Sequence, residues 1–150
     1  MKIKVAWVGK TADAAIAVLT AEYLKRITRY AEIVEIAVKD EAAILSLASG
    51  DGRREGRKER HQLILLDSRG KQFSSEDLAA MLEREQLNAV PLLFAVGGSD
   101  GFSEEARRRA GLVLSLGKMT LPHELARVVL VEQIYRAFTI LRNHPYHLGH

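Results

Sequence analysis

The chain has 150 residues, of which 47% are hydrophobic and 27% charged, a composition that indicates one globular domain and excludes a largely disordered chain. It contains no cysteine, which excludes disulfides, thiolate zinc sites and cysteine nucleophiles. The formal net charge of +3 is too small for unselective attraction to phosphate, so a nucleic-acid partner is expected to be recognised by its shape.

The distribution of apolar residues indicates the cellular compartment of the protein. No apolar run reaches the roughly 18 residues that a membrane span requires, and no stretch has the flanks of a secretory signal. We therefore expect the protein in the cytoplasm.

The first forty residues predict two strands and a helix. Alternating side chains predict a strand over 2–9, and a second strand over 32–38 with Val34, Ile36 and Val38 on one face. Between them a helical spacing predicts a helix from about Asp13 to Tyr30, with a buried stripe of Ile16, Leu19, Tyr23 and Ile27.

Residues 39–61 form the least regular stretch. The apolar piece 42–48 could be a short helix, and the stretch 49–61, SGDGRREGRKERH, is rich in glycine and charge. A solvated loop or frayed helix end explains its composition. A mobile basic arm that touches RNA phosphate is the functional alternative, because five of these residues are Arg or Lys.

From residue 62 onward strand and helix patterns alternate. The run QLILLD over 62–67 predicts a short strand, and SRGK over 68–71 predicts a turn. Ser74 is expected to cap a helix over about 75–87, with Asp77 completing a capping box. Further expected elements are a strand in PLLFAVGG (91–98), a helix capped by Ser103 and ended by Gly111, a strand in LVLSLG (112–117), and a long helix from Pro122 to about Arg142.

This alternation predicts an α/β domain with a mostly parallel sheet. Ligands of such sheets bind beyond the carboxyl ends of the strands, which here are 66–67, 97–98 and 116–117. The stretch GGSDGF (97–102) fits neither the dinucleotide glycine pattern nor the phosphate loop, so a tight turn and a cofactor loop both remain open.

The last helix and the tail carry the remaining candidates. The helix is apolar nearly all round but contains Arg127, Glu132 and Arg136, whose charges need partners: one another, a second subunit, or a ligand. His123 at its start is most simply structural. The tail NHPYH holds His144, Tyr146 and His147, but a metal site there would lack a third ligand nearby in the sequence.

Six segments together carry a resemblance to a known family: EYLKR (22–26), LLDSRGK (65–71), FSSEDLA (73–79), FAVGGSDGF (94–102), LSLGKMTLPHELARVVLVEQIYRAF (114–138) and HPYH (144–147). They resemble the ribosomal RNA large subunit methyltransferase H family, which methylates N3 of a pseudouridine in 23S ribosomal RNA. The resemblance covers nearly the whole chain. The segment 42–61 departs from the family pattern.

The resemblance implies a fold that periodicity alone would not suggest. Members have the SPOUT fold, an α/β domain with a mostly parallel sheet whose C-terminal part, here about 62–150, forms a deep trefoil knot. The whole chain, 1–150, is then a single SPOUT domain. Members are homodimers, and they bind S-adenosylmethionine in the knot loops without a metal.

Family site residues can be carried over by position. The implied cofactor contacts are Leu66, Gly97, Leu116, Gly117, Lys118, Met119, Thr120 and Leu121. The implied substrate-side residues, in this knot or in that of the dimer partner, are His123, Arg127, Glu132, Tyr135, Arg136, Tyr146 and His147.

The resemblance also suggests roles. Arg136 would stabilise the deprotonated base or an adjacent phosphate, while Tyr146 and His147 would stack on or hydrogen-bond the base. His147 is a candidate proton acceptor. The expected substrate is the assembled ribosome. Two alternatives remain: a related SPOUT enzyme that modifies transfer RNA or another ribosomal site, and a non-catalytic ribosome-binding homologue.

Overall fold

The computed structural model describes residues 1–50 and 59–148. Most of the basic stretch predicted as a loop or RNA-binding arm therefore lies outside the described residues. Within the described part, no helix is both long and apolar enough to span a bilayer.

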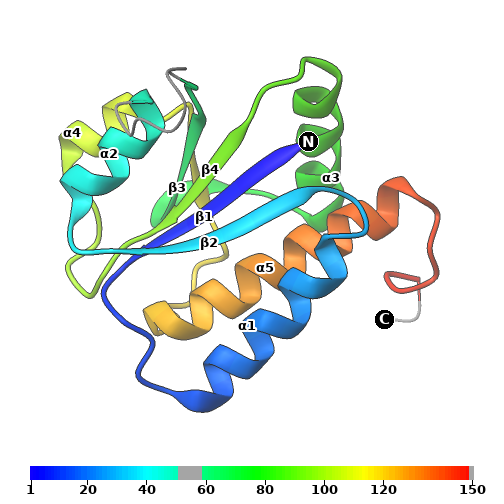
Figure 1. Ribbon diagram of the computed structural model, residues 1–150, viewed down its shortest axis with the longest axis horizontal. Helices are drawn as coiled ribbons and strands as arrows, with labels where there is room; N and C mark the ends of the chain where they lie inside the picture. The colour runs from blue at the N-terminus through cyan, green and yellow to red at the C-terminus, as the bar shows by residue number, and fades with distance from the viewer. Residues whose placement is uncertain (51–58, 149–150) are drawn as a thin grey trace.

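A five-stranded sheet forms the centre of the structure (Figure 1). Its strand order is β2-β1-β4-β3-β5, and every pair of neighbours is parallel. The strands are β1 (Lys2–Val8), β2 (Glu32–Val38), β3 (Gln62–Gln72), β4 (Leu92–Val96) and β5 (Leu112–Ser115). The predicted α/β fold with a parallel sheet is confirmed.

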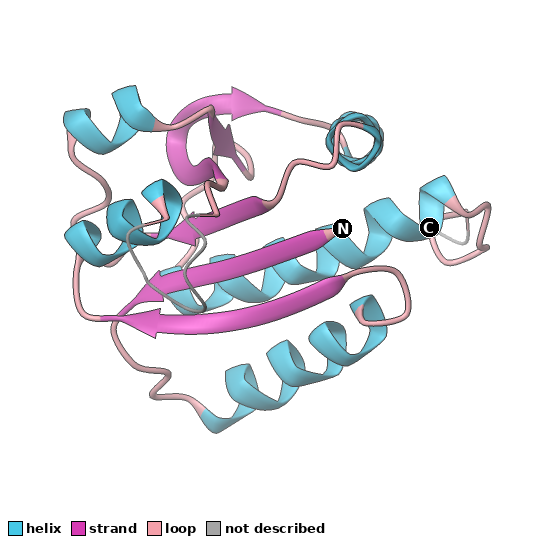
Figure 2. Ribbon diagram, turned by 45° about the horizontal axis from the view of Figure 1, so that its top comes forward, coloured by secondary structure: helices cyan, strands magenta, loops and turns pink. Residues whose placement is uncertain are grey.

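Helices cover both faces of this sheet (Figure 2). One face packs against α1 (Ala14–Ile27), α3 (Ser75–Leu87) and α5 (His123–Leu141), and the other against α2 (Glu41–Ser49) and α4 (Glu104–Arg109). The alternation of β1 explains the two layers, since Val5 and Trp7 join the first core and Ala6 joins the second.

One apolar residue of the predicted stripe of α1 is exposed instead of buried. Leu19 is 46% exposed. The helical spacing was correct for Ile16 and Ile27, which are buried. The prediction fails for Leu19 because α1 packs along α5 and leaves its outer flank open.

Side-chain caps begin the helices where the sequence predicted them. The Ser74 hydroxyl accepts from the Asp77 amide at 3.0 Å, and the Asp77 carboxylate accepts from the Ser74 amide at 2.9 Å, which confirms the capping box of α3. Ser103 caps α4 in the same way, through the Ala106 amide. Pro122 precedes α5, a helix of 19 residues.

The turn predicted over 68–71 is wrong. The strand β3 continues through it for 11 residues and shifts register, so that Leu66 and Lys71 both pair with Leu114. Gly70 lies in this shift, where an added Cβ would be 2.6 Å from the Val113 carbonyl oxygen. The absence of a side chain at Gly70 thus allows β3 and β5 to approach closely.

We expect Gly70→Ala to lower the free energy of unfolding by about 1–3 kcal/mol, because the new methyl group overlaps backbone atoms that cannot move aside independently. Urea unfolding followed by Trp7 fluorescence measures the loss. The control is Gly98→Ala, whose Cβ would find only Val8 Cγ1, at 4.0 Å. Equal stability of the two variants would contradict the account of Gly70.

Candidate functional site

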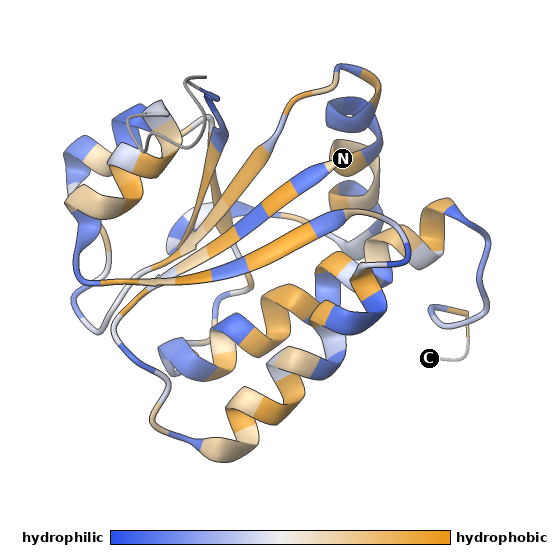
Figure 3. Cartoon of the chain, in the orientation of Figure 1, coloured by the Kyte–Doolittle hydropathy of each residue, from blue (hydrophilic) through white to orange (hydrophobic). Residues whose placement is uncertain are grey.

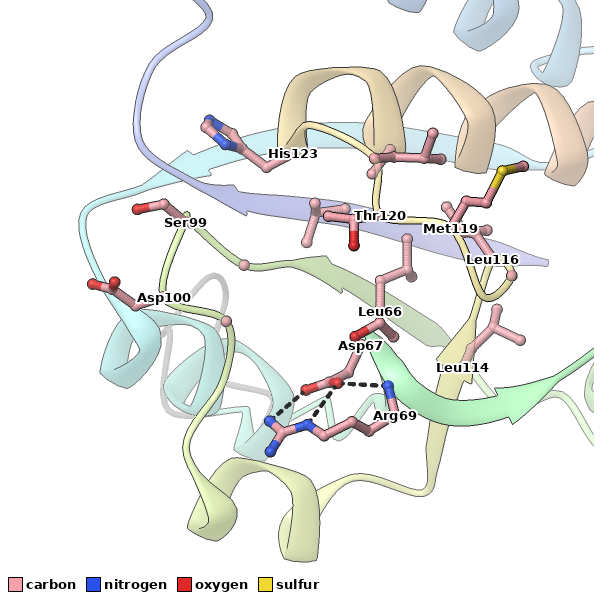
Figure 4. A pocket seen from close by; sticks show the side chains of 18 residues that line it. Leu66, Asp67, Arg69, Ser99, Asp100, Leu114, Leu116, Met119, Thr120 and His123 are labelled. Carbon is pink, nitrogen blue, oxygen red and sulfur yellow. Dashed lines mark hydrogen bonds and ion pairs between the residues drawn. The ribbon is translucent and has the colours of Figure 1, made fainter.

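A cavity of about 330 Å³ opens at the carboxyl ends of β4 and β5, beside residues 66–69 in the middle of β3 and the start of α5 (Figure 4). This is the place predicted from the strand ends. Its lining contains seven of the eight residues predicted to contact a cofactor: Leu66, Gly97, Leu116, Gly117, Met119, Thr120 and Leu121. The eighth, Lys118, does not line it. That these residues bind a cofactor stays a prediction.

The loop after β5 forms one wall of the cavity. Gly117 has a φ of +144°, which favours glycine, and its amide donates to the Ser115 hydroxyl at 3.2 Å. That hydroxyl in turn donates to the Gly117 carbonyl at 2.9 Å. The loop is thereby held against the strand, while the Met119 side chain beyond it is 86% exposed.

The glycine-rich loop after β4 forms a second wall. Its residues make a tight turn in which the Gly101 amide donates to the Gly98 carbonyl at 3.1 Å. An added Cβ on Gly97 would meet the Phe102 ring at 3.2 Å. The stretch thus forms a tight turn that also lines the cavity, and its role as a cofactor loop stays a prediction.

Asp67 anchors the positive charge beside the cavity. Its side chain is 6% exposed and accepts from Arg69 Nε and Nη2, each at 3.2 Å, while Arg107 Nη1 lies 3.6 Å away. Burial acts to raise the pKa of Asp67, but the hydrogen bonds from Arg69 and the charge of Arg107 outweigh it and hold that pKa below its ordinary value. Asp67 is therefore ionised and fixes both guanidinium groups.

His123 and Arg127, both predicted on the substrate side, have different surroundings. His123 lines the cavity at the first turn of α5. Arg127 is only 2% exposed; it donates to the Thr11 hydroxyl at 2.6 Å, and its guanidinium lies 3.9 Å from the centre of the Trp7 ring. Burial lowers the pKa of Arg127. Arg127 thus ties the loop after β1 to α5 and does not line the cavity.

The other predicted substrate-side residues form a cluster at the far end of α5. Glu132 Oε1 accepts from Arg136 Nη2 at 2.7 Å and from the Tyr146 hydroxyl at 2.9 Å. Arg136 Nη1 lies 3.1 Å from His147 Nδ1. The Tyr146 ring packs edge-on against Tyr135, with 4.8 Å between ring centroids. Burial and hydrogen bonds with Tyr23 and Glu132 raise the pKa of Tyr146. We call Glu132, Arg136, Tyr146 and His147 the tail cluster.

The cavity and the tail cluster are separate within one chain. Arg136 follows His123 by 13 residues along α5, which corresponds to about 20 Å along the helix axis. The seven residues predicted on the substrate side therefore fall into three places: His123 at the cavity, Arg127 in the core, and the tail cluster, against which Tyr135 packs.

Glu76 is a contact of the tail cluster that sequence reasoning missed. Its Oε1 atom lies 2.7 Å from His147 Nε2. The only sequence signal was an acidic residue in the first turn of a capped helix, and no spacing connects it to a residue 71 positions later.

His144 does not join the tail cluster through its ring. Its Nδ1 atom accepts a hydrogen bond from the Tyr146 amide. Among the described residues, no three His, Asp or Glu side chains are placed to hold a metal.

Comparisons with known proteins place this geometry in context. The family described as "Predicted SPOUT methyltransferase" matches residues 1–147. A protein of Koribacter versatilis named "Ribosomal RNA large subunit methyltransferase H" is 50% identical, with 100% of both chains covered. One of the same name from Geobacter sulfurreducens is 44% identical over 98% of this chain and 99% of its own.

Similarity to solved structures supports the fold alone. A methylase family protein from Haemophilus influenzae superposes with a TM-score of 0.57 at 11% identity, covering 98% of this chain and 69% of that one.

We expect Asp67→Asn to lower stability in a pH-dependent way. Because the folded-state pKa of Asp67 lies below that of the unfolded chain, about 3.9, the stabilisation is complete above that pH and is lost as the pH falls through the folded-state pKa. Urea unfolding of the wild type and of Asp67→Asn between pH 7 and pH 2 should show the difference in their free energies of unfolding shrinking below about pH 4. A constant difference over this range would contradict the ionised Asp67. Asp100→Asn is the control. Asp100 is an exposed carboxylate in the lining of the same cavity, and its substitution should lower the free energy of unfolding only slightly.

Proposed function

Because the chain belongs to the SPOUT methyltransferase family, we propose that it methylates N3 of a pseudouridine in 23S ribosomal RNA, within the assembled ribosome, using S-adenosylmethionine. The observation that carries the proposal is the full-length similarity to relatives named for large-subunit ribosomal RNA methylation. The chain then acts as one SPOUT domain over residues 1–150, knotted within about 62–150, in the cytoplasm.

The cavity at the strand ends fits the proposed cofactor. Its volume of about 330 Å³ lies in the range of small-molecule sites. Leu66, Leu114 and Leu116 supply apolar surface for an adenine ring, and the glycines at 97 and 117 allow backbone groups to approach its edge. S-adenosylmethionine bound there would supply an electrophilic methyl group on a positively charged sulfur, with the neutral thioether as the leaving group.

The chain's part in the reaction is to position the base and favour its anion. The uracil-type N3 must give up its proton, here to solvent water, for its lone pair to form the new N–C bond while the S–C bond breaks. In the proposed reaction the Arg136 guanidinium stabilises the negative charge on the base or binds the adjacent phosphate, and the Tyr146 ring supplies a surface on which the base stacks.

The separation of the two groups along α5 supports a homodimer as the working form. Arg136 lies ten residues, or about 15 Å along the helix axis, beyond Ala126, the last residue of α5 that lines the cavity, so its side chain does not reach a methyl group bound in its own chain. A second copy, lying with its α5 reversed, would bring its tail cluster to this cavity. Figure 3 shows apolar stretches along both α1 and α5. Exposed apolar residues on α1 and around the start of α5 supply a surface for such a partner: Val18, Leu19, Leu121 and Leu125.

Labelled S-adenosylmethionine given to assembled ribosomes from cells lacking this modification tests the proposal. Free 23S RNA and transfer RNA are incubated alongside, and the nucleosides are identified by mass spectrometry. N3-methylpseudouridine in assembled ribosomes alone is the expected result. Label only in transfer RNA would favour a related SPOUT activity, and no label despite cofactor binding would favour a ribosome-binding protein without catalysis; either result overturns the proposal.

We expect Arg136→Ala to lower the rate of methyl transfer about 100-fold, because a charge aimed at the developing anion is lost. Its affinity for S-adenosylmethionine, measured by calorimetry, should be unchanged because Arg136 is assigned to the base and does not line the cavity. Arg142→Ala is the matched control, since Arg142 is an exposed arginine at the end of the same helix. An Arg136→Ala protein with the wild-type rate would remove Arg136 from the mechanism.

A further inference from the structure

The ring of His147 lies between two helices and contacts a charged group on each side. On α5, Arg136 Nη1 is 3.1 Å from Nδ1. On α3, Glu76 Oε1 is 2.7 Å from Nε2. Both ring nitrogens are therefore engaged, and the side chain of His147 is 28% exposed.

These two partners determine where the ring proton lies. A guanidinium group carries only N–H donors, so Nδ1 must present its lone pair to Arg136. A carboxylate is an acceptor, so Nε2 must carry the proton and donate it to Glu76. The ring that satisfies both contacts is the neutral imidazole protonated at Nε2.

We propose that Glu76 is a positioning residue, which holds His147 in the Nε2-protonated form so that the ring orders the tail cluster and does not act as the base. The proposal rests on the function proposed above, since it concerns the residues assigned to the substrate side. It also revises the suggestion that His147 accepts the substrate proton: while both contacts exist, no ring nitrogen offers a free lone pair.

The start of α3 prepares Glu76 for this role. The capping box of Ser74 and Asp77 fixes the first turn, in which Glu76 lies. A hydrogen bond with its own backbone amide and the bond with His147 keep the pKa of Glu76 below its ordinary value, so it is present as the acceptor. Because its side chain is 63% exposed, the contact adds little to stability and acts chiefly on orientation.

Arg136 links this contact to the rest of the cluster. Its Nε and Nη2 donate to Glu132 Oε1 at 3.0 and 2.7 Å, which leaves Nη1 directed at His147. The same Glu132 oxygen accepts from Tyr146. Glu76 thus fixes the outer end of a chain of hydrogen bonds that also orients Tyr146 and Arg136.

Ring-nitrogen NMR of the ¹⁵N-histidine-labelled protein tests the assignment without any substrate. His147→Asn identifies its signals among the five histidines. In the wild type we expect the proton of His147 on Nε2, and in Glu76→Ala a mixture of both tautomers. Glu76→Gln retains an acceptor oxygen and should restore the wild-type pattern. Glu83→Ala, an exposed glutamate on the same helix, is the control and should leave the pattern unchanged.

Methylation kinetics on assembled ribosomes supply the second readout. Glu76→Ala should lower kcat about tenfold through misplacement of the tail cluster, leave KM for S-adenosylmethionine unchanged, and be rescued by Glu76→Gln. A proton on Nδ1 in the wild type, or a Glu76→Ala protein with unchanged tautomer, would overturn the proposal, whatever its activity. If the wild type methylates no ribosomal RNA, the proposed function fails, and the NMR comparison alone decides the role of Glu76.

Discussion

The burial of α5 is the constraint on which the rest of the structure depends. This helix packs against both α1 and α3 on one face of the sheet, and Leu130, Ile134 and Phe138 along it are at most 2% exposed. Apolar burial of this extent, at roughly 25 cal/mol per Å², fixes the helix relative to the strands. Because α5 begins at the cavity and ends at the tail cluster, its packing sets the distance between the two groups of polar residues.

Charges on this helix are tolerated because each has compensation within the described residues. Glu132 and Arg136 form a pair with side chains about one-sixth exposed. Arg127 is more deeply buried and faces the Trp7 ring and the Thr11 hydroxyl, while its Nε atom has no hydrogen-bond partner in the described part of the chain. A buried cation with incomplete hydrogen bonding costs free energy, so the surrounding apolar contacts must offset that cost.

The cavity at the start of α5 lies where the chain leaves β4 and β5 and where β3 shifts its register. Two departures from regular geometry shape it: the register shift in β3, which Gly70 permits, and the left-handed backbone at Gly117. Asp67 lies between Leu66 and this shift and holds Arg69 and Arg107 against the wall. The site is therefore formed by irregular positions on a regular parallel sheet, where ligands of such sheets commonly bind.

By itself the sequence determined what depends on near neighbours: the periodicity of the strands, the capping box at Ser74, the N-cap at Ser103, and the parallel sheet implied by alternation. It also located the three segments that meet at the cavity, and family resemblance named eight of the lining residues. Only the tertiary structure decided that 68–71 continues β3, that Arg127 faces Trp7, and that Glu76 contacts His147. These features depend on contacts between residues far apart in the chain, and such contacts leave no local periodicity or spacing from which they can be predicted.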